Sequence, residues 1–119
     1  MSKVYPNKHT QLCWQVGFVV SYPVGGETFK YGDNVSITIE IGSSTVDYIM
    51  SVHLYGEDGT EYGLVVQNVP VKDRGEVTSE FKLKVRHDIS PGEYFYRAVG
   101  SNSPRSQCYT DSNLFNIVL

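Results

Sequence analysis

Residues 22–41 read YPVGGETFKYGDNVSITIEI, and this stretch decides the fold class. Turn-forming residues fill its first half, and apolar side chains then alternate at Val35, Ile37, Ile39 and Ile41. Such alternation, bounded by turn-forming residues, predicts a β-strand that buries one of its two faces. Residues 85–99 (VRHDISPGEYFYRAV) follow the same plan, with a Pro-Gly corner before a tyrosine-rich strand. Together the two stretches predict a two-layer β-sandwich.

The rest of the chain adds alternating segments without a helical period. We expect about seven strands, and strands of this number and spacing are typical of an immunoglobulin-like or fibronectin-III-like antiparallel sandwich. We therefore expect an all-β protein with a polar N-terminal arm at residues 1–15 and one sandwich domain at residues 16–119. The expected strands are residues 16–21, 34–41, 48–55, 62–68, 77–86, 94–99 and 114–119.

The composition fits one such domain and argues against several functions. The 119 residues are 40% hydrophobic and include nine tyrosines, which suits a core built from half-buried strands. The net charge of −3 gives no basic footprint for nucleic acid and no polybasic patch for a membrane surface. No apolar run approaches the roughly 18 residues that span a bilayer, so we expect no membrane insertion.

No arrangement of side chains predicts catalysis, a cofactor or a metal ion. His9, His53 and His87 lie on an expected arm, strand and loop, without the spacing of metal ligands. The acidic stretch at residues 57–61 (EDGTE) fits a hairpin turn better than a calcium loop, because it lacks the regularly spaced oxygen ligands of such a loop. No pair of carboxylates is marked for glycoside hydrolysis. We expect a protein that is not an enzyme and holds no metal or cofactor.

Two features bear on the compartment. Cys13 and Cys108 are the only cysteines, and an immunoglobulin-like sandwich brings the start of its first strand and the loop before its last strand to one end. They form either a disulfide or two buried free thiols. A bridge closing nearly the whole chain stabilises by about 4–5 kcal/mol in the loop-entropy model and implies an oxidising compartment. Asn34-Val35-Ser36 is a glycosylation sequon, with Asn34 expected to point outward.

The order of the turn and strand motifs over residues 18–119 resembles a known family. The motif residues are Pro23, Gly25, Gly26, Thr28, Phe29, Gly32, Val35, Ile37, Ile39, Val52, Leu54, Tyr55, Asn68, Val69, Pro70, Pro91, Gly92, Tyr94, Arg97, Phe115 and Ile117. In this order they resemble the immunoglobulin-like domain of fungal Ser/Thr-rich GPI-anchored wall proteins and of yeast cell-wall synthesis proteins of β-1,6-glucan assembly. The family often has Trp where Phe29 stands, and its Ser/Thr-rich tail does not occur in this sequence.

The resemblance implies a secreted, extracellular module that is associated with the cell wall and has no catalytic residues. Its expected function is to bind a cell-wall polysaccharide or to aid wall assembly. The alternative is a secreted protein–protein interaction module of the effector or adhesin type, with an extracellular protein or a second copy of the chain as its partner. The sequence favours no particular ligand.

Alternation also predicts an interaction face on one sheet. Since the tyrosine after Pro-Gly points inward in this family, Tyr94, Tyr96 and Ala98 are expected inside. The strands at 48–55, 94–99 and 114–119 are expected to be neighbours, and their outward side chains then form a patch of a kind that marks interaction surfaces. The expected patch consists of Ile49, His53, Tyr55, Phe95, Arg97, Val99, Leu114 and Val118. It is covered either by a partner or by the N-terminal arm.

A second candidate surface is the polar stretch at residues 100–112, which we expect to be a long loop. Long polar loops on a rigid sandwich commonly carry binding residues. Tyr109 is expected to stack on a sugar ring, with Arg105 and Asp111 hydrogen-bonding to its hydroxyl groups. The alternative is a solvated connection without a function.

Overall fold

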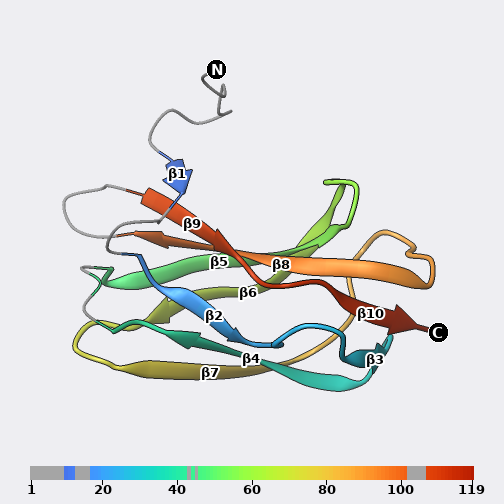
Figure 1. Cartoon of the computed structure of the whole chain (residues 1–119), viewed down its shortest axis with the longest axis horizontal. Coiled ribbons are helices and arrows are strands. Elements are labelled where there is room, and N and C mark those ends of the chain that lie inside the picture. The colour runs from blue at the N-terminus through green and yellow to red at the C-terminus, as the bar shows by residue number, and fades with distance from the viewer. Residues whose placement is uncertain (1–9, 13–16, 43, 45, 102–106) are drawn as a thin grey trace.

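The computed structural model describes residues 10–12, 17–42, 44, 46–101 and 107–119 (Figure 1). These residues form ten strands in two sheets, one of seven strands and one of three. The two sheets face each other across a shared core. The chain is an all-β sandwich, as the alternation predicted. The described residues include no helix long and apolar enough to cross a membrane.

The large sheet is built around β8 (Gly92–Ser101). On one side β8 pairs with β5 (Tyr48–Gly56), which pairs with β6 (Glu61–Pro70) at the sheet edge. On the other side β8 pairs with β10 (Phe115–Val118) along its first half and with β9 (Gln107–Asp111) along its second half. The expectation that β5, β8 and β10 are neighbours is therefore confirmed.

The small sheet consists of β2 (Val19–Tyr22), β4 (Asn34–Glu40) and β7 (Glu76–Lys82), all antiparallel. The predicted register of β4 is correct, because Ile37 and Ile39 are buried and the side chains between them face outward. This alternation puts the apolar face of β4 against the large sheet.

Three strands were not predicted from the sequence. β1 (Thr10–Leu12) falls in the predicted N-terminal arm, and β3 (Thr28–Lys30) falls in a stretch expected to be turns. Both are three residues long and pair in parallel with the last strands, β1 with β9 and β3 with β10. β9 lies within residues 100–112, so the expectation of a single long loop there is wrong. Strands this short carry too few alternating residues to show a period.

Aromatic rings fill the centre of the core. Tyr96, Phe18 and Phe115 are among the largest fully buried side chains. Phe115 lies 4.7 Å from Tyr96, measured between ring centroids, and contacts the half-buried Phe29 edge-on at 5.4 Å. Phe81 is half-buried and meets Tyr96 edge-on. The predicted inward residues of β8 and β10 are thus the residues that join the two sheets.

Candidate binding face

The candidate site is the outer face of the large sheet, where β5, β8 and β9 lie side by side (Figure 1). In β8 the inward residues Tyr94, Tyr96 and Ala98 are buried, and Phe95 and Arg97 between them are half-buried on the outer side. The in/out assignment of this strand is confirmed. Strand alternation therefore brings these outward side chains together on one surface.

The prediction for β5 is wrong at its start. Ile49 was expected on the outer face, yet it is fully buried, whereas Met50, expected inside, is 37% exposed. The pairing of β5 with β8 shifts register between Ile49 and Ser51, so β5 has one extra residue there. This β-bulge turns Met50 and Ser51 outward in succession and reverses the assignment before Val52. Beyond it, Leu54 is buried and His53 and Tyr55 face outward, as predicted.

At the centre of the face, Arg97 lies among three aromatic rings. Tyr55 and Phe95 are opposite each other on β5 and β8, and their rings stack at 5.4 Å with an angle of 16° between their planes. The guanidinium carbon of Arg97 lies 4.8 Å from the centre of the Tyr55 ring, 5.8 Å from that of Phe95 and 4.2 Å from that of Tyr109. A cation within about 6 Å of a ring centre is attracted by the negative ring face. We call Tyr55, Phe95, Arg97 and Tyr109 the aromatic–arginine cluster.

Asp111 fixes the position of Arg97. Arg97 Nε donates to Oδ1 at 2.8 Å and Nη2 donates to Oδ2 at 3.0 Å, so both carboxylate oxygens are used. The hydrogen bonds that Arg97 donates to Asp111 raise the pKa of Arg97, and the negative charge of Asp111 acts in the same direction. A two-point ion pair of this geometry holds a planar group in one orientation.

Four further predicted residues surround the cluster on this face. Nε2 of His53 lies 3.4 Å from Oε2 of Glu61 on the neighbouring β6. Val118 on β10 is 42% exposed. Val99 and Leu114 are half-buried, and Val99 lies directly opposite Tyr109 on β9. Seven of the eight predicted interaction residues therefore point away from the core, Ile49 being the exception.

The second predicted site, in the expected loop at residues 100–112, lies partly in a strand. Tyr109 and Asp111 belong to strand β9, and their side chains join the same outer face through Arg97. Tyr109 is only 8% exposed, so the ring face expected to meet a sugar is largely covered. Arg105 lies outside the described residues. The structure thus merges part of the second site into the first.

Several remaining predictions concern single residues. Asn34 is exposed at the start of β4, as a glycan attachment requires. Cys108 lies in β9 opposite Gln11, and Cys13 lies outside the described residues, so their bridge stays a prediction. Among the described residues, no group of three or more His, Cys, Asp or Glu side chains is placed to hold a metal ion.

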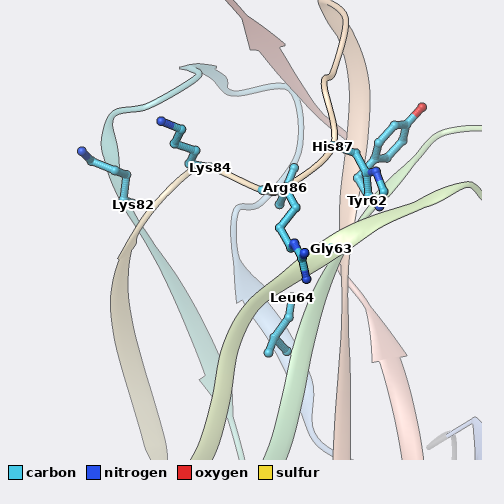
Figure 2. Close-up of a pocket in the computed structure, with 8 residues that line it drawn as sticks. Tyr62, Gly63, Leu64, Lys82, Lys84, Arg86 and His87 are labelled. Atoms are coloured by element: carbon cyan, nitrogen blue, oxygen red, sulfur yellow. The ribbon is translucent and has the colours of Figure 1, made fainter.

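A basic pocket that was not predicted from the sequence lies at the edge of the sandwich (Figure 2). Tyr62, Gly63 and Leu64 of β6 line one side, and the other side is lined by Lys82, Lys84, Val85, Arg86 and His87. Its signal in the sequence was the run KLKVR at 82–86, which was read as the end of a strand. The strand ends at Lys82, and the following residues cross between the two sheets.

Comparison with known proteins supports the fold. No protein-family model matches the chain, and no curated protein sequence does so. A solved structure described as fibronectin(III)-like modules of CbhA from Clostridium thermocellum matches with a TM-score of 0.53 and 18% sequence identity. The match covers 85% of this chain and 94% of that one. At this identity it shows a fibronectin-III-like sandwich.

Proposed function

We propose that this chain is a non-catalytic, extracellular binding module that holds a cell-wall polysaccharide on the outer face of its large sheet. The observation that carries the proposal is the aromatic–arginine cluster on that face. Its planar groups lie on three paired strands, and Asp111 holds the arginine between them. A binding surface on rigid strands needs little ordering when the ligand arrives.

The chemistry of the cluster suits a sugar chain. A pyranose ring has apolar C–H faces and a rim of hydroxyl groups. Tyr55 and Phe95 offer half-exposed aromatic surface for the first, and the polar groups of Arg97, Asp111 and His53 offer hydrogen bonds for the second. Sites that combine apolar surface with a few placed polar groups are typical of small-molecule recognition.

Secretion and wall association belong to the same proposal. They are supported by the exposed sequon at Asn34, by the expected Cys13–Cys108 bridge and by the resemblance to fungal wall proteins.

Titration with glucan oligosaccharides tests the proposal. β-1,3- and β-1,6-linked oligomers are added to the wild type and to Phe95→Ala and Tyr55→Ala, and heat is measured. We expect binding that each substitution weakens about tenfold, because stacking on an aromatic ring is worth roughly 1 kcal/mol or more. Val19→Ala is the control, since it removes a 50% exposed apolar side chain from the small sheet. If neither the β-1,3- nor the β-1,6-linked oligomers bind, the proposal is contradicted.

A protein partner is the second candidate, because apolar exposure continues beyond the cluster. Met50 is 37% exposed and Val118 is 42% exposed at separate places around the face. The contiguous part of this apolar surface is the stacked pair Tyr55 and Phe95, and a contiguous exposed apolar patch marks an interaction surface. Sedimentation of the wild type and Phe95→Asp separates the candidates: a wild-type dimer that the substitution dissociates, together with no glucan binding, establishes the second.

A further inference from the structure

The basic pocket between the edges of the two sheets has the features of a second binding site. It encloses about 660 Å³ between β6 and residues 82–87, within the size range of ligand pockets. It is separate from the aromatic–arginine cluster, since none of the pocket residues belongs to that cluster.

The backbone of the basic segment is held in place by hydrogen bonds. Gly32 N–H donates to the carbonyl oxygen of Leu83 at 2.8 Å, and Leu83 N–H donates to that of Asp33 at 2.9 Å. The hydroxyl of Tyr31 accepts from Val85 N–H at 2.9 Å and donates to the Val85 carbonyl at 3.1 Å. Leu83 is fully buried. The segment is therefore a fixed scaffold, although it belongs to neither sheet.

This scaffold projects three cations on alternate residues. Lys82, Lys84 and Arg86 are exposed, and among the described residues none of them takes part in an ion pair. Lys84 N–H donates to the Lys82 carbonyl at 2.8 Å, which is the hydrogen bond of a three-residue turn. Figure 2 shows the two lysine side chains extending in the same direction and the Arg86 side chain directed toward Leu64. Neighbouring cations without an acidic partner attract an anion.

The edge of β6 beside the pocket is unsuited to adding another strand. The pairing of β5 with β6 shifts register twice, so β6 has an extra residue at Tyr62 and another at Val65. Bulges interrupt the regular row of backbone groups that a new strand would need. Gly63 also lies close to the basic segment, where an added Cβ would come within 3.1 Å of Val85 Cβ. An extended peptide is therefore disfavoured, and recognition through side-chain charge is favoured.

We propose that this pocket binds an acidic polysaccharide, a sugar chain that carries sulfate or carboxylate groups. Lys82, Lys84 and Arg86 contact its anionic groups, and Tyr62 and Leu64, which is 44% exposed, contact the apolar faces of its sugars. Nucleic acid fits less well, because it needs a long basic footprint. The basic surface here does not continue onto the outer face of the small sheet, which carries Glu40, Glu76 and Glu80.

Binding to dextran sulfate, with uncharged dextran as the neutral counterpart, tests this inference. The protein is produced without N-glycosylation, because Asn34 is the cross-strand partner of Lys82. We expect dextran sulfate and polygalacturonate to bind and uncharged dextran not to bind. Lys84→Gln and the double variant Lys82→Gln/Arg86→Gln each weaken binding about tenfold or more, because each removes at least one charge-assisted hydrogen bond to the polyanion.

The matched control is Lys72→Gln/Arg74→Gln, which removes one exposed lysine and one exposed arginine beyond the opposite end of β7, outside the pocket. It is expected to stay within about twofold of the wild type, because distant exposed charges are screened. An equal loss in the control variant, equal binding of uncharged dextran, or no binding of either polyanion overturns the inference. Tighter binding of a single-stranded DNA oligonucleotide that the pocket variants abolish also overturns it. Phe95→Ala is expected to leave dextran sulfate binding unchanged, which separates this inference from the proposed function.

Discussion

Arg97 and Asp111 form a two-point ion pair across β8 and β9, at 2.8 Å and 3.0 Å. The pair lies directly opposite in the register of the two strands, and its side chains are 29% and 32% exposed. It fixes the guanidinium against the rings of Tyr55 and Tyr109. The orientation of Arg97 in the candidate binding face therefore depends on this contact.

Asp111→Asn is expected to lower the free energy of unfolding by about 1 kcal/mol. The amide keeps one acceptor oxygen but loses the charge and the second acceptor, and partly exposed ion pairs contribute modestly. Urea unfolding measures the change. Asp88→Asn is the control, since it removes the same charge from an exposed loop position. Equal stability of both variants would show that the ion pair does not hold the face together.

Tyr96→Phe is expected to stabilise the protein by about 1 kcal/mol. The Tyr96 hydroxyl is buried, and within the described part of the chain it has no hydrogen-bond partner. A buried polar group left without a partner costs roughly 1–3 kcal/mol, whereas the phenylalanine ring keeps the contacts with Phe81 and Phe115. Thermal unfolding measures the effect. A lower melting temperature for Tyr96→Phe would mean that the hydroxyl stabilises the folded chain.

The same residue makes stability depend on alkaline pH. Burial raises the pKa of Tyr96 well above its ordinary value of about 10. Above pH 10 the unfolded chain releases this proton while the folded chain keeps it, so the contribution to stability is complete below about pH 10 and is lost as the pH rises further. Unfolding at pH 9 and pH 11 is therefore expected to separate wild type from Tyr96→Phe, with the larger alkaline loss in the wild type. Parallel losses would contradict this.

Gly100→Ala is expected to destabilise the fold by about 1–3 kcal/mol, as overpacked cores do. A Cβ at this position would lie 2.5 Å from Cε1 of Phe18 and 3.0 Å from Cγ1 of Val46, and both neighbours are buried. Gly75→Ala is the control, because no atom lies within 4 Å of its added Cβ. Urea unfolding of both variants is the measurement, and equal midpoints would contradict the close packing of β8 against Phe18.

The bridge between Cys13 and Cys108 is checked by a thiol count. Unfolded, unreduced protein is expected to show no reactive thiol, and reduced protein two. Gln11 lies opposite Cys108 in the pairing of β1 with β9, two residues before Cys13 in the sequence. Two reactive thiols before reduction would refute the bridge and weaken the proposal of an extracellular location.

The sequence predicted the fold because its long strands alternate clearly. In β4 every second residue is apolar and faces the core, so its register follows from the pattern. In β8 the outward residues Phe95 and Val99 are apolar as well, and its register was predicted from the family resemblance. The sequence also predicted that Tyr55, Phe95 and Arg97 lie together on the outer face of one sheet. The ion pair of Arg97 with Asp111 was not predicted, because it requires the register of β9, whose residues QCYTD do not alternate between apolar and polar.

Two errors have a common physical origin in interrupted alternation. A single extra residue near Met50 moved Ile49 into the core, and nothing in the local composition marks that bulge. Lys82, Lys84 and Arg86 keep the spacing of a strand, yet the strand ends at Lys82 because the chain there leaves the small sheet to pair with residues 32 and 33. Alternation predicts which side chains share a face, but it does not reveal where the backbone leaves a sheet.

The central claim is that the aromatic–arginine cluster binds a wall polysaccharide, and mapping of NMR shifts tests it most directly. Glucan oligomers are added to ¹⁵N-labelled protein, and the backbone amide signals and the Nε signal of Arg97 are followed. We expect dose-dependent shifts at Tyr55, Phe95 and Arg97, with residues of the small sheet unchanged. Shifts confined to β4 and β7, or no shifts at saturating glucan, would contradict the claim.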